Sequence, residues 1–246
     1  MLAYQQYPIP YVGGSAADAL ALEETHVFVD DEVVSDAIGL GLIVSEKPFG
    51  LAVQHGHEPI AGPMVATDTE AGTIAELDGD PALDAYRAAV REPAREHYGI
   101  DVDDLGAGEL QQLLTFFEFG IRTGEDDYKV RWPGLTPDTS GPLVFPGTIP
   151  QGTELYVMHS PKAAQISSAR EAGRTAVESL DGHRPAGALV FDCACRGAIL
   201  GEEFDEAVAA MGAPLAGFET YGEVNLQPGE MRGFHNTTSS ILLFPA

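Results

Sequence analysis

The sequence predicts a mixed α/β fold in which strand-rich sheets are covered by helices. β-Branched, partly alternating stretches recur through the chain, which is the pattern of strands buried on one face. Two long segments, 80–92 and 160–180, instead space their apolar residues as amphipathic helices do. Near the C-terminus a strand, a helix and a second strand follow one another, an order typical of α/β units.

Five strands are expected in the first third of the chain. They cover 25–30, 32–46, 49–56, 63–70 and 72–79. Two further stretches, 10–18 and 214–223, share a Pro-apolar-apolar-Gly start and a closing acidic residue. This weak similarity between the two stretches is consistent with two related halves, although two short stretches do not prove a duplication.

The helix that follows is expected to begin at Asp80-Pro81, because Asp is a preferred N-cap and Pro a preferred first helical residue. Its buried face is expected to comprise Leu83, Tyr86, Ala89 and Val90. A strand meander is then expected over 114–123, 128–134 and 152–160.

The C-terminal third is expected to alternate strands and helices. The stretch 186–194 has almost no polar residue, so we expect a strand buried on both faces. An amphipathic helix is expected over 201–212, and the last two strands over 213–223 and 235–244.

Acidic residues dominate the charge of the chain. Among 246 residues, 38 are Asp or Glu and 13 are Lys or Arg, a formal net charge of −25. Nucleic acids and anionic membranes bind basic surfaces, so we expect neither as a partner. We expect a halophilic, cytoplasmic protein whose carboxylates keep it soluble in strong salt, which screens their repulsion. The N-terminus has no signal-peptide pattern, and no stretch of about 18 apolar residues predicts a membrane helix.

Both cysteines, Cys193 and Cys195, stand at the end of the apolar stretch and would face the same side of a strand. A structural zinc site needs four ligands, and only His55 and His57 could add two, so we expect no metal and no cofactor. The C-x-C spacing cannot form a disulfide framework, which favours a reducing compartment.

Two interpretations of the thiols stay open. Arg196 lies close to Cys193 in sequence and could lower a thiol pKa, with His235 as the base of a catalytic cysteine. The other interpretation is that a cysteine in a buried strand packs as a small hydrophobic residue.

Arg196 follows an apolar strand, where a mixed sheet commonly opens a ligand crevice. A guanidinium there either pairs with a buried acid or captures a ligand carboxylate or phosphate. Glu223 follows another strand expected nearby, so a structural Arg196–Glu223 pair and a ligand contact both remain open.

His235, Asn236 and Thr237 precede the final strand, where such side chains either satisfy a turn or line a polar pocket. The Gly-Gly-Ser loop at 13–15 lacks both the nucleophile elbow and the P-loop pattern, so neither a hydrolase nor an NTPase is indicated.

Three spaced motifs carry a family resemblance. They are Phe-x-Cys-x-x-Arg at 191–196, Gly-Phe-x-Thr-x-Gly-Glu at 217–223 and His-Asn-Thr-Thr at 235–238. In this order they resemble the C-terminal part of FIST domains. The stretch 74–90 resembles the start of the same domain, and 11–70 resembles the latter part of the FIST N-terminal domain. We therefore expect the latter part of the N-terminal domain over 1–68 and the C-terminal domain over 69–246.

The resemblance implies a sensory, ligand-binding module of signal transduction, with amino acids as suggested ligands. It points to seven site residues, which are Cys193, Arg196, Thr220, Glu223, His235, Asn236 and Thr237. Cys195 lies outside the family pattern. Members usually carry a longer N-terminal domain, so we expect either a short member or a chain completed by a partner subunit or an upstream start.

The first hypothesis is therefore a cytoplasmic sensor of a small anionic or zwitterionic ligand, with a signalling protein as a further partner. Arg196 would bind a carboxylate, Glu223 would orient it or pair with an amine, and Asn236, Thr237 and Thr220 would add neutral hydrogen bonds. The alternatives are a cysteine-dependent enzyme using Cys193 with His235, and a protein–protein adaptor without a small ligand. The residues complete no catalytic constellation, so a non-enzymatic role is favoured.

Overall fold

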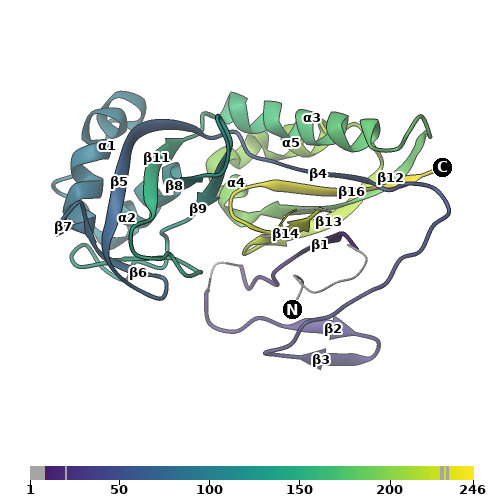
Figure 1. The fold of residues 1–246 in the computed structure, drawn as a ribbon, viewed down its shortest axis with the longest axis horizontal. Helices are drawn as coiled ribbons and strands as arrows, with labels where there is room; N and C mark the ends of the chain where they lie inside the picture. The colour runs from purple at the N-terminus through teal and green to yellow at the C-terminus, as the bar shows by residue number, and fades with distance from the viewer. Residues whose placement is uncertain (1–8, 20, 228–229, 231–232) are drawn as a thin grey trace. The chain divides into compact units, whose positions relative to one another are not determined.

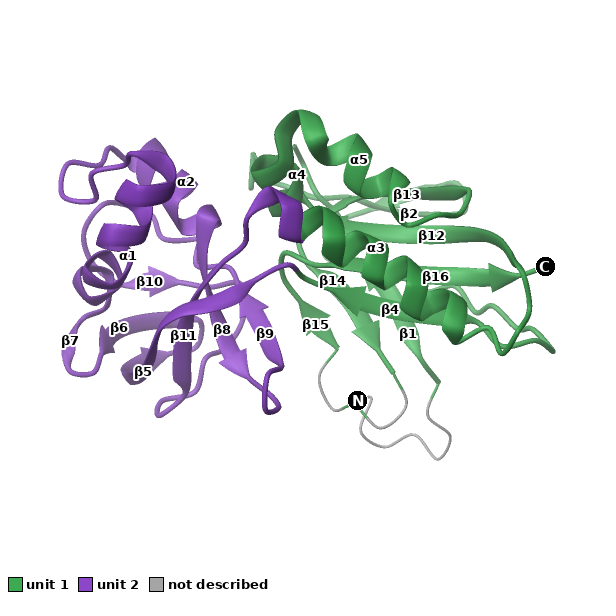
Figure 2. Cartoon of the chain, turned by 90° about the horizontal axis from the view of Figure 1, so that it is seen from above, with its two compact units in different colours: residues 1–55, 165–246 green, residues 56–164 purple. Residues whose placement is uncertain are grey.

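The computed structural model describes residues 9–19, 21–227, 230 and 233–246. The chain forms two compact units, drawn in green and purple in Figure 2. Unit 1 combines residues 1–55 with 165–246, and unit 2 comprises residues 56–164. Both units contain helices and strands, which confirms the mixed α/β class. The expected domain boundary between 68 and 69 stays a prediction.

Unit 1 contains three sheets. The strands are β1 Tyr11–Gly14, β2 Val27–Val29, β3 Glu32–Val34, β4 Gly50–Gln54, β12 Pro185–Cys193, β13 Leu215–Thr220, β14 Glu223–Leu226, β15 Phe234–His235 and β16 Ser239–Pro245. The main sheet has the order β13-β12-β16-β4, in which β12 runs parallel to β13 and antiparallel to β16. A second sheet has the order β1-β14-β15, and β2 with β3 forms a hairpin.

The helices of unit 1 cover one face of the main sheet (Figure 1). They are α3 Lys162–Glu178, whose first turn starts at the end of unit 2, α4 Ala194–Leu200, the 3₁₀ turn Gly201–Glu203 and α5 Phe204–Ala209. α3 lies close to the sheet because β4 begins with Gly50, where a Cβ would stand 2.1 Å from the carbonyl oxygen of Ala176. Small side chains on α3, among them Ala169 and Ala172, pack into the core beneath it.

Unit 2 is a seven-stranded antiparallel sheet with two helices. The strands are β5 Glu58–Glu70, β6 Thr73–Leu77, β7 Asp80–Pro81, β8 Phe117–Arg122, β9 Tyr128–Arg131, β10 Leu143–Val144 and β11 Glu154–His159, and the helices are α1 Ala82–Tyr98 and α2 Ala107–Phe116. The strand order is β10-β6-β5-β11-β8-β9, with β7 paired to β6. On α1 the expected stripe is confirmed, because Leu83, Tyr86 and Val90 are buried and Ala89 packs against them.

Several expectations about elements are wrong. The strand over 186–194 was expected to be buried on both faces, but β12 alternates buried and half-buried residues from Gly187 to Phe191. The helix expected over 201–212 is a 3₁₀ turn at Gly201–Glu203 followed by the shorter α5.

The N-cap of α1 is Pro81 and no side chain caps it, because Asp80 belongs to the short strand β7. The strand expected over 32–46 ends at Val34, since no strand of the described residues pairs with positions 35–46. The strand expected over 114–123 begins only at Phe117, because α2 precedes it. Among the described residues, no helix is long and apolar enough to cross a membrane.

Candidate functional site

The seven predicted site residues all lie in unit 1, and all are buried. Cys193 ends β12 and is paired in register with Thr220, which ends the parallel neighbour β13. Glu223 begins β14 and is paired with His235 of β15. Asn236 and Thr237 follow β15, and Arg196 lies in α4 directly after β12. The structure therefore gathers these residues at the strand ends of one unit, and their role as a binding site stays a prediction.

Glu223 is held by three hydrogen bonds in a fully buried position. The Thr220 hydroxyl donates to Oε1 at 2.5 Å. The backbone N–H and the hydroxyl of Thr238 donate to Oε2 at 3.1 and 2.8 Å. Burial raises the pKa of Glu223 to about 7 despite these hydrogen bonds, and the nearby Asp192 carboxyl adds to the increase. Glu223 therefore exchanges its proton near neutral pH.

Arg196 is the largest fully buried side chain of the described chain, and its partner is Asp192. Nε donates to Oδ1 of Asp192 at 2.6 Å. The other guanidinium nitrogens donate to α3, where they meet the side chain and carbonyl of Gln165 and the Ser168 hydroxyl. The acid that pairs with Arg196 is thus Asp192, while Glu223 is bound by threonines.

Asp192 belongs to the same buried cluster and was not among the residues predicted from the sequence. Its second carboxylate oxygen accepts a hydrogen bond from Ser239 Oγ at 2.6 Å, which ties β12 to β16. Burial raises the pKa of Asp192, although the charge of Arg196 opposes the increase. The sequence does contain a signal for this pairing, because Asp192 is the one charged residue of β12 and lies four positions before Arg196.

Three buried amide atoms around this cluster have no hydrogen-bond partner in the described part of the chain: Gln165 Nε2, Asn225 Oδ1 and Asn236 Oδ1. Asn225 still donates to Ala52 O and to Ser240 Oγ, at 2.9 and 3.0 Å. Asn236 is 2% exposed and lies between His235 and Thr238, both neighbours of Glu223. Buried polar atoms are nearly always hydrogen-bonded, so an unpaired acceptor here suits a donor from outside the chain.

The cysteines differ from the expected arrangement. Cys193 ends β12, but α4 begins at Ala194 and places Cys195 in the helix, so the two do not share a strand face. Both are buried and neither forms a disulfide. His235 Nε2 lies 3.0 Å from the carbonyl oxygen of Asn225, to which it must donate its hydrogen. While that bond is made, this nitrogen cannot accept the proton of Cys193.

No cluster of three or more His, Cys, Asp or Glu residues with metal-site geometry occurs within the described ranges. Of the two histidines considered as further ligands, His55 falls in unit 1 and His57 in unit 2. His57 Nε2 lies 3.9 Å from the Glu118 carboxylate of the same unit, and both side chains are inaccessible to solvent.

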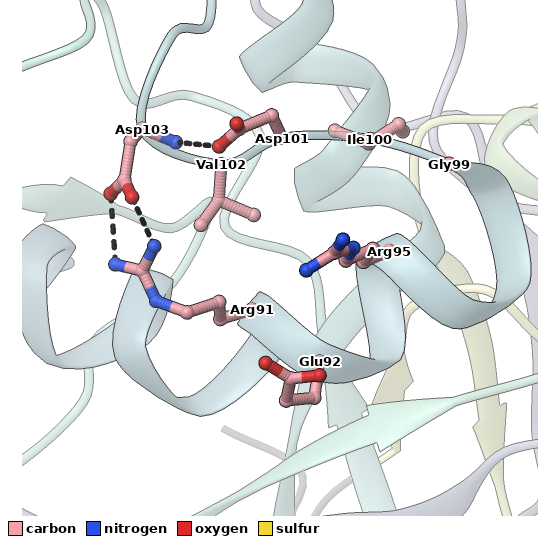
Figure 3. Close-up of a pocket in the computed structure, with 8 residues that line it drawn as sticks. All are labelled: Arg91, Glu92, Arg95, Gly99, Ile100, Asp101, Val102 and Asp103. Atoms are coloured by element: carbon pink, nitrogen blue, oxygen red, sulfur yellow. Dashed lines mark hydrogen bonds and ion pairs between the residues drawn. The ribbon is translucent and has the colours of Figure 1, made fainter.

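A separate hollow of about 290 Å³ lies in unit 2, at the C-terminal end of α1 (Figure 3). Both terminal guanidinium nitrogens of Arg91 donate hydrogen bonds to the carboxylate of Asp103. Arg95 also lines the hollow, and Figure 3 draws no such hydrogen bond for it. These residues were not predicted from the sequence, although the four-residue spacing of Arg91 and Arg95 places them on one helix face. Three carboxylates, those of Glu92, Asp101 and Asp103, line the hollow beside the two guanidinium groups.

Comparison with known proteins identifies the family. Residues 1–80 match the FIST N domain and residues 82–225 match the FIST C domain. FIST domains are associated with sensory signal transduction. Over 88 residues the chain is 32% identical to an uncharacterized protein of Methanocaldococcus jannaschii, a stretch that covers 36% of this chain and 17% of that protein. No solved structure matches the chain.

Proposed function

Because the chain belongs to the FIST family, we propose that it is a cytoplasmic sensory domain that binds a small anionic or zwitterionic ligand, such as an amino acid, at the buried polar cluster of unit 1. The cluster comprises Asp192, Arg196, Thr220, Glu223, Asn236 and Thr237. The observation that carries this proposal is the unpaired, buried amide oxygen of Asn236 beside the partners of Glu223.

The cluster suits an ammonium group. A protonated amine offers several N–H donors, which match the Asn236 oxygen and a carboxylate such as that of Glu223. Since the pKa of Glu223 is about 7, a positive charge beside it stabilises the ionised form at neutral pH. The ligand would thus supply the counter-charge that the threonine hydroxyls do not.

The anionic group of the ligand is assigned to Arg196. Two of its hydrogen bonds, to Ser168 Oγ and to the carbonyl oxygen of Gln165, are 3.2 Å long and weaker than the 2.6 Å bond to Asp192. A ligand carboxylate that replaced them would leave the Asp192 pair intact. Gln165 Nε2, which has no partner among the described residues, would be a further donor toward it.

A cysteine-dependent enzyme is the weaker alternative, since the buried Cys193 would need a base and His235 Nε2 is bonded to a carbonyl. A protein–protein adaptor without a small ligand is the other alternative, and the unpaired buried oxygen of Asn236 favours the ligand-binding proposal over it.

Thermal unfolding in high potassium chloride, against a panel of amino acids and small carboxylates, tests the proposal. A ligand that binds the native state raises the midpoint, by an amount equivalent to about 2.7 kcal/mol at a hundred times its Kd. In Asn236→Ala we expect at least about tenfold weaker binding, since one buried hydrogen bond to a charged group is lost.

The matched control is Arg95→Ala, which removes the guanidinium of the unit 2 hollow and should leave the shift unchanged. If Arg95→Ala abolishes the shift and Asn236→Ala does not, the ligand binds in unit 2, which contradicts the proposal. A folded sample without any shift across the panel also contradicts it.

A further inference from the structure

The segment between β3 and β4 exposes a run of large apolar side chains. Residues 37–45 read Ala-Ile-Gly-Leu-Gly-Leu-Ile-Val-Ser and carry no charge. Four of their side chains are 79–85% exposed, namely Ile38, Leu40, Leu42 and Val44. Single exposed apolar residues are common on proteins, whereas a contiguous set marks an interaction surface. In Figure 1 this segment is part of the tube that joins β3 to β4.

The exposed residues occupy alternate positions, which is the spacing of one face of a strand. The opposite face carries Gly39 and Gly41 in its centre, and its one large apolar residue, Ile43, is less exposed at 48%. A Cβ at Gly39 would lie 3.0 Å from Val27 and 3.3 Å from Val29, so the glycine side faces β2. The apolar side therefore has the geometry of a strand face that no described residue of the chain covers.

The backbone of this segment also has no partner strand. Across the described residues, neither the strand pairings nor the other backbone hydrogen bonds involve positions 37–44. Free N–H and C=O groups of an extended segment pair readily with a strand of another chain. A strand pattern without a strand partner therefore points to a partner from outside.

The charge of the residues around this segment indicates which kind of partner it can bind. Residues 22–46 contain no Lys or Arg, and their carboxylates are all exposed: Glu23, Glu24, Asp30, Asp31, Glu32, Asp36 and Glu46. A second copy of the chain would bring two such sets of negative charge together, which opposes association. A partner with basic residues on either side of its apolar positions would meet complementary charge.

We propose that residues 37–45 dock an extended segment of another protein, one that alternates apolar residues and carries lysine or arginine at both ends. Backbone pairing would hold the two segments together, and packing against Leu40 and Leu42 would fix their register. The surrounding carboxylates would select the basic ends. This surface is independent of the buried cluster of unit 1.

Two synthetic strand peptides test the proposal by fluorescence anisotropy with the full chain, in the lowest potassium chloride that keeps it folded. Both alternate valine and threonine, and one has lysines at its ends where the other has glutamates. We expect the lysine peptide to bind at least about tenfold more tightly than the glutamate peptide. The double variant Leu40→Asp with Leu42→Asp should weaken its binding at least about tenfold, because the apolar contact is lost.

The matched control is Ala37→Asp with Ser45→Asp, which adds the same charge at the two ends of the segment, on its other face, and should retain binding. Equal affinity for the two peptides would overturn the proposal, as would unchanged binding by the leucine variant. So would a wild-type dimer, seen by light scattering, that Leu40→Asp with Leu42→Asp converts to a monomer, because the occupant would then be a second copy.

Discussion

Asp192 and Arg196 form a buried ion pair across the junction at which β12 ends and α4 begins. Nε of Arg196 lies 2.6 Å from Oδ1 of Asp192, and the side chains are 0% and 4% exposed. Ser239 holds the other carboxylate oxygen and Gln165 of α3 holds the guanidinium, so the pair connects a helix to the central strands. This network fixes the strand end that carries Cys193 and its neighbour Thr220.

Removing the guanidinium should destabilise the protein. Arg196→Leu leaves the Asp192 carboxyl buried without its counter-charge, so we expect the free energy of unfolding to fall by about 3–5 kcal/mol. Urea unfolding at neutral pH measures it. The control is Arg174→Leu, an exposed arginine of α3 paired with Glu171 and Glu178, which should lose much less. If both variants lost the same free energy of unfolding, the buried pair of Arg196 with Asp192 would stabilise the fold no more than an exposed pair does.

The pKa of Glu223 predicts a pH dependence of stability. The folded value is about 7 and the ordinary value is 4.5, so the folded state binds this proton more tightly than the unfolded chain. Its contribution is complete below pH 4.5 and is lost as pH rises through 7, a change on the order of 3 kcal/mol. In Glu223→Gln this loss should disappear. Urea unfolding midpoints of the wild type and of Glu223→Gln, measured at pH 5 and pH 8, test this prediction. If the midpoint falls equally in both proteins, other groups cause the pH dependence.

The two buried asparagines should respond differently to truncation. Asn225→Ala removes two hydrogen bonds and leaves their acceptors, Ala52 O and Ser240 Oγ, unpaired, so we expect a loss of about 1–3 kcal/mol. Asn236→Ala removes an oxygen that has no partner within the described chain, so the unliganded protein should keep its stability. Thermal denaturation of both variants without ligand makes the comparison. A larger loss in Asn236→Ala would mean that this side chain has a structural role instead.

The net charge of −25 predicts that salt stabilises the fold. Self-repulsion among carboxylates weakens as the screening length falls from about 10 Å at 0.1 M salt to about 3 Å at 1 M. We expect the unfolding midpoint to rise across this range of potassium chloride, as it should for a halophilic protein. Sucrose at equal osmolality is the control, because it adds no screening. A midpoint that rises equally in sucrose would argue against charge repulsion as the cause.

The spacing of apolar residues within a segment predicted those helices and strands whose type is set by local sequence. The stripe of Leu83, Tyr86 and Val90 predicted α1, and the apolar stretch at 186–194 predicted β12, because burial imposes its period on the sequence. The spaced motifs also predicted that Arg196, Thr220 and Glu223 belong to one site region, although a motif does not state which side chains bond to one another.

Features that depend on distant partners were not predictable. Residues 35–46 have strand-like composition, but a strand exists only where a second strand pairs with it. Glu223 was one of two partners left open for Arg196 because both residues follow strands, whereas the acid that pairs with Arg196 is Asp192, which is closer in the chain. The contribution of Gln165 came from a helix 31 positions away, which no local pattern reveals.

Proton release on ligand binding tests the central claim most directly. At pH 7 Glu223 is about half protonated, so a ligand ammonium placed beside it should displace part of a proton into the buffer. Calorimetric titration of the best ligand, in two buffers with different ionisation enthalpies, measures this release. We expect release in the wild type and none in Glu223→Gln. Equal proton exchange in both proteins, or none in either, would contradict binding at the buried cluster.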